Sequence, residues 1–180
     1  MVSLVAKGAF DGLGLPMTVA GTTLAALDPG PVASVAPFAG RVAEVEAILG
    51  AALPPPGQAV PLGAGRMLWT GPGRALLVGM RPPEGLVALA AVVPQGDGIA
   101  AAVLEGPAAR EVLARLVPLD LRDRAFPVGA TARTLLGHMT ITLTRVAPDA
   151  WEILAMRSMA VTVARELSEA MHAVAAREGA

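Results

Sequence analysis

Residues 95–174 read QGDGIAAAVLEGPAAREVLARLVPLDLRDRAFPVGATARTLLGHMTITLTRVAPDAWEILAMRSMAVTVARELSEAMHAV, and this stretch decides the fold. Residues 98–106 form an apolar run typical of a buried strand, and Pro107 suits the first turn of a helix. Residues 131–137, 139–146 and 151–156 predict three more strands. In the second of these, apolar residues alternate with threonines, as expected for a half-buried strand. The order is strand, helix, three strands and a final helix.

The final helix has the clearest pattern of the chain. Its apolar residues recur at helical spacing, whereas its charged residues lie off that stripe. We expect Ser158 to cap its N-terminus, because a serine hydroxyl can accept a hydrogen bond from a free backbone N–H there. The stripe consists of Met159, Val163, Leu167, Ala170, Met171 and Val174.

The first half of the chain has weaker signals. Residues 17–27 predict a short strand or two, and residues 34–53 predict a helix with Pro37 in its first turn. Three consecutive prolines then require a loop over 53–65. Apolar runs at 66–70 and 74–80 flank Gly-Pro-Gly and predict a hairpin, and a short helix is expected over 84–91.

These elements predict an α+β fold of two small halves, each an antiparallel sheet with helices packed on one face. The expected division is an N-terminal extension with short strands over 1–33, a first half over 34–94 and a second half over 95–180. We expect the halves to form one compact unit.

Composition narrows the range of functions. The chain has 180 residues, 54% hydrophobic and 16% charged, with a net charge of −1, 3% aromatic residues and no cysteine. The absence of cysteine excludes disulfides, thiolate catalysis and sulfur-ligated metal. Low charge and few aromatics argue against a nucleic-acid partner. The most apolar run is shorter than the roughly 20 residues that cross a bilayer, so we expect a cytoplasmic protein with no membrane partner.

The stretch GAGRMLWTGPGR (63–74) has the glycines of a phosphate-binding loop but not their spacing. A dinucleotide fingerprint needs a third glycine where Met67 and Leu68 stand, and a P-loop ends in Gly-Lys-Ser/Thr. The stretch also precedes a strand, where these motifs precede a helix. We interpret its glycines as turn residues.

Few side chains are candidates for chemistry. His138 lies between two predicted strands without a nearby carboxylate or nucleophile, so we expect a turn or interface residue and not a general base. His138 and His172 lack metal-ligand spacing. We therefore predict no catalytic, cofactor-binding or metal-binding residue in this chain. The candidate interface or anion contacts are Arg133, His138, Arg157, Ser158, Trp69 and Trp151.

Five phrases resemble the gamma subunit of heterotetrameric sarcosine oxidase, in the same order along the chain. They are SVAPFAG (34–40), RMLWTGPGRALLVG (66–79), LEGPAAREVLARLVPLDL (104–121), FPVGATARTLLGHM (126–139) and WEILAMRSMAVTVARELSEAMHAVAAR (151–177). Two local departures are Gly98-Ile99, where the family often has a tryptophan, and Met159, where it often has an aromatic residue. Gamma-like subunits of N-methylglutamate dehydrogenase are related.

The resemblance implies a subunit of an enzyme that oxidatively demethylates sarcosine to glycine. It implies alpha, beta and delta partner subunits, which carry FAD, FMN, NAD, zinc and tetrahydrofolate, and no cofactor on this chain. It also implies a fold similar to the folate-binding domain of the glycine-cleavage T-protein.

Two other functions remain open at this point: a folate- or small-molecule-binding protein similar to an aminomethyltransferase, and a gamma-like subunit of N-methylglutamate dehydrogenase. A pocket lined by an acidic residue and an arginine favours the binding protein, whereas a broad exposed apolar face favours the assembly subunit.

Overall fold

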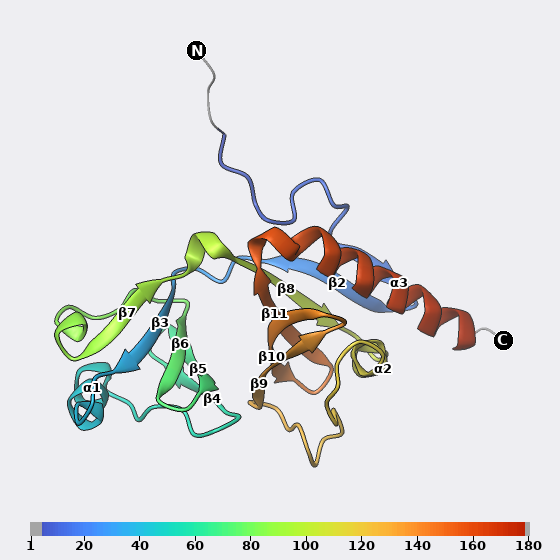
Figure 1. The fold of residues 1–180 in the computed structure, drawn as a ribbon. Helices are drawn as coiled ribbons and strands as arrows, with labels where there is room; N and C mark the ends of the chain where they lie inside the picture. Colours follow the sequence, from blue (N-terminus) through green and yellow to red (C-terminus); the bar gives the residue numbers. More distant parts are fainter. Residues whose placement is uncertain (1–4, 179–180) are drawn as a thin grey trace.

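The computed structural model describes residues 5–178 and contains two antiparallel sheets that pack against each other (Figure 1). The six-stranded sheet has the spatial order β1 (Met17–Val19), β2 (Thr22–Leu27), β8 (Ile99–Glu105), β11 (Ala150–Met156), β10 (Met139–Ala147) and β9 (Thr131–Leu136). The five-stranded sheet has the order β4 (Ala59–Leu62), β5 (Gly65–Gly71), β6 (Arg74–Val78), β3 (Val32–Pro37) and β7 (Ala90–Pro94).

The six-stranded half consists of the six-stranded sheet with two helices, α2 (Ala109–Ala114) and α3 (Ala160–Glu178), on its outer face. Strand β10 shows why the sheet packs this way. Ile141 and Leu143 are buried in the cluster under the helices, whereas Thr140 and Thr142 line the opposite face. The alternation read from the sequence therefore separates the helix side of the sheet from the side that meets the other sheet.

Helix α2 is attached to a strand from the other end of the chain. The Thr22 hydroxyl of β2 lies 3.2 Å from the backbone nitrogen of Ala108 at the helix N-terminus and accepts its hydrogen bond. Gly106 precedes the helix with φ of 127°, and a Cβ there would lie 2.5 Å from the Gly21 carbonyl oxygen. A glycine is therefore required where β8 ends and the chain passes β2.

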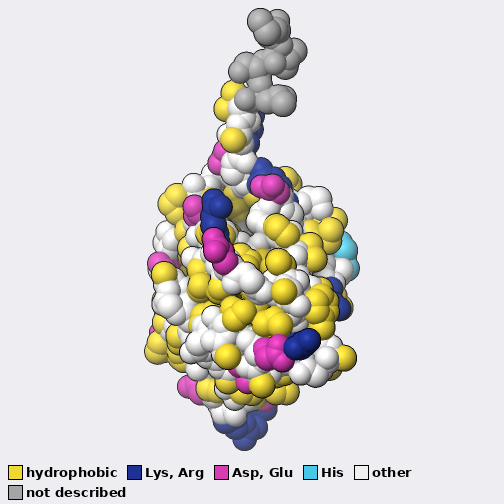
Figure 2. Space-filling model, turned by 90° about the vertical axis from the view of Figure 1, so that its left-hand side faces the viewer, with side chains coloured by type: hydrophobic (Ala, Val, Ile, Leu, Met, Phe, Trp, Pro, Cys, Tyr) yellow, Lys and Arg dark blue, Asp and Glu magenta, His cyan; other side chains and the backbone are white. Residues whose placement is uncertain are grey.

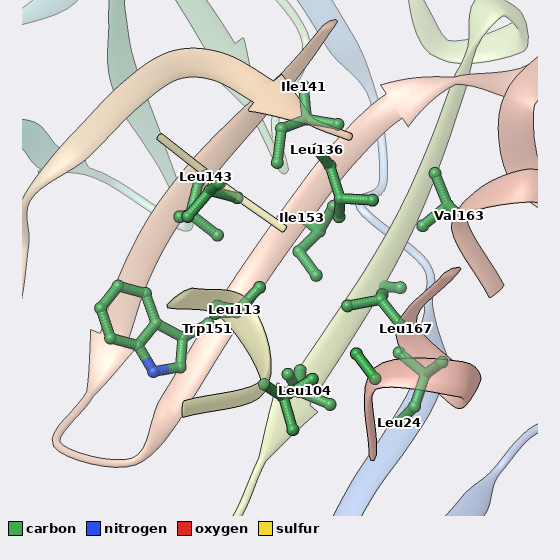
Figure 3. Packing of buried hydrophobic residues seen from close by; sticks show 14 of the residues in the cluster. Leu24, Leu104, Leu113, Leu136, Ile141, Leu143, Trp151, Ile153, Val163 and Leu167 are labelled. Atoms are coloured by element: carbon green, nitrogen blue, oxygen red, sulfur yellow. The ribbon is translucent and has the colours of Figure 1, made fainter. Parts of the chain in front are cut away.

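Apolar side chains from β2, β8, β10, β11, α2 and α3 fill the core of the six-stranded half (Figure 3). Leu24, Leu104, Leu113 and Leu167 meet in this core, and Trp151 is fully buried at its edge. Burial of large side chains of this kind contributes roughly 1.5–3 kcal/mol each.

The five-stranded half consists of the five-stranded sheet with helix α1 (Val42–Leu49) and the 3-10 turn η1 (Leu86–Ala88) on its outer face. Its core is smaller and is built around Val45, Met67, Leu77 and Leu86. A third cluster, which includes Leu68, Leu76 and Leu154, joins the inner faces of the two sheets. The order of layers is thus helices, six strands, five strands and helix.

The predicted α+β fold with antiparallel sheets is confirmed, but several local predictions from the sequence are wrong. The loop expected over 53–65 contains strand β4, which pairs with β5. The helix expected from residue 34 begins only at Val42, because residues 34–37 belong to β3, which pairs with both β6 and β7. The helix expected over 84–91 is a single 3-10 turn. Gly85 is left-handed there (φ 82°), and Ala90–Pro94 pairs with β3.

Ser158 requires a further correction. It lies inside the 3-10 turn η3 (Arg157–Met159), and α3 begins at Ala160, so Ser158 is too early to cap that helix.

The domain boundaries at 33/34 and 94/95 stay a prediction. Strands β1 and β2 join the sheet formed by residues after 98. Among residues 5–178, no helix is both long and apolar enough to span a membrane.

Candidate functional site

The candidate contact residues are spread over the molecule and do not form one site. Arg133 is exposed on the edge strand β9, and His138 is exposed in the turn that joins β9 to β10. Arg157 and Ser158 are exposed in η3, while Trp69 is half-buried on β5. The structure brings none of these side chains together around a reacting centre.

Trp151 is a core residue and not a surface contact, because its side chain has no exposed area. Its ring lies 5.4 Å from the Phe126 ring, and the Arg145 guanidinium carbon lies 5.2 Å from the Trp151 ring centroid. This cation–π arrangement adds to the burial energy of the indole. Trp151 therefore stabilises the six-stranded half.

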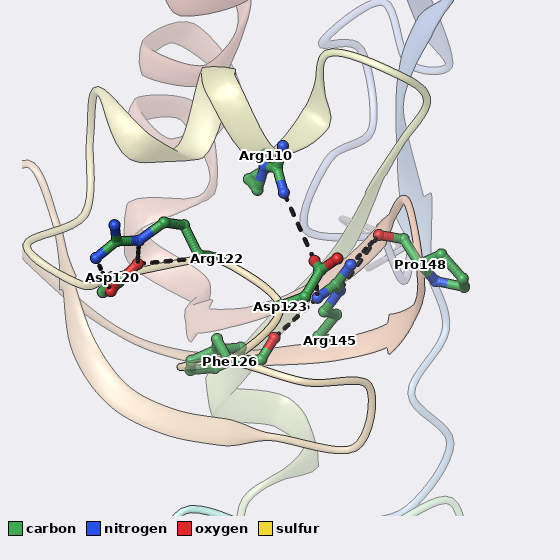
Figure 4. Close-up of polar contacts among 7 residues, drawn as sticks. All are labelled: Arg110, Asp120, Arg122, Asp123, Phe126, Arg145 and Pro148. Atoms are coloured by element: carbon green, nitrogen blue, oxygen red, sulfur yellow. Dashed lines mark hydrogen bonds and ion pairs between the residues drawn. The ribbon is translucent and has the colours of Figure 1, made fainter.

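Arg145 is a buried charge that the sequence does not predict (Figure 4). Its Nη1 donates to Asp123 Oδ1 at 2.8 Å and to the Phe126 carbonyl at 2.9 Å, and its Nη2 donates to the Pro148 carbonyl at 2.6 Å. Arg110 also lies 3.6 Å from Asp123. Since these partners belong to two separate loops, Arg145 fixes the connection after α2 against the β10–β11 turn.

The same connection contains a second ion pair at its surface. Arg122 Nε and Nη2 donate to the two carboxylate oxygens of Asp120 at 2.8 and 2.5 Å. These hydrogen bonds lower the pKa of Asp120 from 3.8 to about 2, and they raise the pKa of Arg122. Both groups are exposed, so the pair orders the loop and does not create a reactive carboxyl.

One ion pair crosses between the sheets. Arg66 of β5 donates from Nη2 to Glu152 Oε2 of β11, and Glu152 is almost completely buried. The Arg66 side chain keeps 29% of its surface exposed, against 5% for Glu152. The pair holds the two halves in register and gives the buried carboxylate its counter-charge.

A groove of about 650 Å³ lies where the N-terminal segment meets β2 and η3. It contains Arg157, Asp11, Asp28 and Asp97. Arg157 donates to the Lys7 carbonyl, Asp11 accepts from the Gly8 amide at 2.7 Å, and Asp28 accepts from the Gly30 amide at 2.9 Å. Arg157, Asp11 and Asp28 thus order the chain's own loops, which gives these three charges a structural explanation.

A second groove of about 500 Å³ separates the two sheets at one end of their contact. Its lining includes Arg74 at the start of β6, Arg133 of β9 and the hydroxyls of Thr140 and Thr142. Leu154 contributes apolar surface to it. The sequence predicts Arg133 as a contact residue but not Arg74, because only the packing of the sheets brings the two strands to one groove.

The histidines show no catalytic arrangement. His138 has no hydrogen-bonding partner among the described residues, and His172 Nδ1 lies 2.8 Å from the Ser168 carbonyl oxygen on an exposed face of α3. Within residues 5–178, no group of three or more His, Cys, Asp or Glu side chains is placed to hold a metal ion.

Exposed apolar side chains gather on the outer face of the five-stranded half, which Figure 2 shows from that side. Hydrophobic atoms spread over much of this view, with charged groups in isolated places. We call this surface the apolar face. It is formed by exposed residues of α1, η1 and the segment after β3, namely Phe38, Val42, Ile48 and Val87.

Comparisons with known proteins place the chain in context. No family model matches it. It is 32% identical over 120 residues to the sarcosine oxidase subunit gamma of Corynebacterium sp. (strain U-96), a match that spans 62% of this chain and 58% of that relative.

Solved structures extend the likeness to almost the whole chain. A chain of the heterotetrameric sarcosine oxidase from Corynebacterium sp. U-96, solved in complex with pyrrole 2-carboxylate, superposes with a TM-score of 0.84 and 26% identity over 94% of this chain and 96% of that chain. The glycine cleavage system aminomethyltransferase T from Bartonella henselae gives a TM-score of 0.60 and 18% identity over 83% of this chain and 46% of that chain, which shows a shared fold. The resemblance read from the sequence is therefore confirmed: the chain is similar in sequence to a sarcosine oxidase gamma subunit and in structure to a chain of heterotetrameric sarcosine oxidase.

Proposed function

We propose that this chain is a non-catalytic gamma-type subunit that assembles and braces the flavin-bearing subunits of an enzyme that oxidatively demethylates sarcosine to glycine. The observation that carries the proposal is the superposition on a chain of a heterotetrameric sarcosine oxidase over 94% of this chain's length. Since both chains are covered almost completely, the likeness extends to the subunit as a whole and not to one motif.

The surface of the protein supports an assembly role. The apolar face keeps Val87 and Phe38 67% and 47% exposed on a chain with only 16% charged residues. Exposed apolar surface of this kind is typical of protein–protein interfaces. The charged groups that could have formed an active site, such as Arg145 and Asp123, are instead hydrogen-bonded within the chain's own loops.

The proposal places FAD, FMN, NAD, zinc and tetrahydrofolate on alpha, beta and delta partner subunits, and none of them on this chain. The absence of flavin absorbance and of stoichiometric zinc in the purified chain is the expected result. A flavin spectrum from the pure chain contradicts it. The cytoplasmic location and the exact N-methyl amino acid that is oxidised stay predictions.

Copurification tests the proposal directly. A tagged chain co-expressed with untagged partner subunits should elute with them as one complex in size-exclusion chromatography. A chain that elutes as a monodisperse monomer and shows no affinity for those subunits contradicts the assembly role.

A substitution of His138 tests whether this chain takes part in catalysis. In the assembled complex His138→Ala should leave turnover within about threefold of wild type, because loss of a general base lowers rates by a hundredfold or more. His172→Ala is the matched control, since it removes the other exposed histidine. A hundredfold loss in the His138 variant alone, with normal assembly, gives this chain a chemical role.

A further inference from the structure

The groove between the two sheets carries positive charge from both halves of the molecule. Arg74 comes from the five-stranded half and Arg133 from the six-stranded half, and both side chains are exposed. The other polar side chains in the groove are hydroxyls and one amide, from Ser34, Thr70, Gln95, Thr140 and Thr142. Among the described lining residues there is no carboxylate, so the groove is electrostatically positive.

Strand register explains why these side chains face the same way. Arg133 of β9 pairs with Thr142 of β10, and Leu135 pairs with Thr140. Paired residues on neighbouring strands project to the same face of a sheet, and here that face looks toward the five-stranded sheet. The groove is therefore a continuous surface of basic, hydroxyl and apolar side chains.

The two arginines differ from most arginines of this chain. Arginines such as Arg41, Arg66 and Arg122 have carboxylate partners within 4 Å. Within residues 5–178, the side chains of Arg74 and Arg133 form neither an ion pair nor a hydrogen bond. Two unpaired guanidinium groups at one groove are available to carboxylates from outside the chain.

We propose that this groove docks an acidic segment of a partner subunit, whose carboxylates pair with Arg74 and Arg133. The inference rests on the proposed assembly function and assigns it a surface. An extended segment fits better than a small molecule, because small-molecule sites bury most of their ligand, whereas Arg74 and Arg133 are both exposed. Exposed Leu135 and Met156 border the arginines and provide apolar contacts for the same segment.

Charge reversal tests the proposal in the intact chain. Arg74→Glu and Arg133→Glu are compared with Arg81→Glu and Arg115→Glu, which reverse exposed arginines outside the groove, one on each half. The dissociation constant for the partner subcomplex that lacks this chain is measured for each variant. Each groove variant should bind roughly five- to tenfold more weakly at low salt, because attraction is replaced by repulsion. Both controls should stay within about twofold.

Two further measurements complete the experiment: the dependence of binding on ionic strength and the thermal stability of each variant. The deficit of the groove variants should shrink as ionic strength rises, since salt screens exposed charges. Unchanged melting temperatures of the isolated variants should show that the loss lies in binding and not in folding. The double variant should also bind more weakly than either single variant.

The outcomes separate the two proposals. If the wild-type chain does not bind the subcomplex, the assembly function fails and the docking groove fails with it. If wild type binds and the groove variants bind as tightly as the controls, only the groove proposal is overturned. A rise in melting temperature with millimolar glutarate that Arg133→Glu abolishes, together with unchanged assembly, also overturns it and assigns the groove to a small anion.

Discussion

The six-stranded half and the five-stranded half of the molecule differ in how completely each can bury its own apolar surface. In the first, the 19-residue helix α3 and helix α2 cover the sheet, and Trp151 and Phe126 are enclosed. In the second, the eight-residue helix α1 and a 3-10 turn cover a smaller core and leave Phe38 and Val87 exposed.

The difference indicates that the two halves have different roles. The six-stranded half holds most of the folding energy, because buried apolar area is the main stabilising contribution. The five-stranded half depends on contact with the other sheet through Leu68, Leu76 and Leu154, and it offers the apolar face. Such an arrangement suits a subunit in which the stable half positions the other half, whose apolar face a partner can cover.

The two tryptophans provide the largest expected contrast between the halves. Trp151→Ala should lower the free energy of unfolding by about 3–5 kcal/mol, because it empties a fully enclosed site and removes the contacts with Phe126 and Arg145. Trp69→Ala, at a half-buried site of the five-stranded half, should cost less than about 2 kcal/mol. Urea unfolding of the isolated chain measures both values. Equal losses contradict the unequal division of stability.

The ion pair between the sheets tests how the halves are joined. Arg66→Met should cost about 3 kcal/mol, because it leaves the buried Glu152 carboxylate without its counter-charge. Glu152→Gln should cost only about 1–2 kcal/mol, since Arg66 can turn toward water. The double variant Arg66→Met, Glu152→Leu should recover most of the loss. A larger cost for Glu152→Gln than for Arg66→Met contradicts this reading of the pair.

The hydrogen bond between the Thr22 hydroxyl of β2 and the N-terminus of α2 tests whether the N-terminal strands stabilise the six-stranded half. Thr22→Val should destabilise the chain by about 1 kcal/mol, because it removes the acceptor for the Ala108 amide at the start of α2. Thr23→Val is the control, since its hydroxyl bonds only the exposed Thr18 hydroxyl at 2.9 Å. Thermal unfolding distinguishes them. Identical melting temperatures for the two variants argue against a stabilising cap.

The smallest effect concerns the pH dependence of the six-stranded half. The pKa of Asp120 is lowered to about 2 in the folded chain, mainly by its hydrogen bonds to Arg122. A lowered carboxyl pKa contributes stability above the unfolded value of 3.8, and this stability is lost as pH falls toward 2. Asp120→Asn should therefore flatten the fall in stability between pH 4 and pH 2. Because the pair is exposed, this effect should be small. If the variant still loses stability steeply between pH 4 and pH 2, another carboxyl is responsible for that loss.

The sequence predicted the second half of the chain better than the first, for a physical reason. Strand β10 and helix α3 show strong periodicity because each has one face in a large core, so the sequence predicts both elements. The sequence of β3 predicts the start of a helix, because VAEVEAIL follows it and Pro37 suits a helical turn as well as a strand end. Its pairing with β6 and β7 is a long-range property that local patterns do not contain.

The candidate site was predicted only in part. Arg133 was singled out, but Arg74 and the buried Arg145 acquire their surroundings only when separate segments meet. The sequence predicts Trp151 as a possible contact because tryptophan is common at interfaces, yet the packing of Phe126 encloses it. Resemblance to a known subunit contributed the functional hypothesis, which composition alone could not supply.

The central claim is that this chain acts through assembly and not through chemistry. The most direct measurement is the rate of flavin reduction by sarcosine under anaerobic conditions, in stopped flow, for the partner subunits with and without this chain. Our account predicts the same limiting rate in both samples and a lower yield of soluble complex when the chain is omitted. A complex that assembles fully without this chain but reduces its flavin far more slowly would contradict the account.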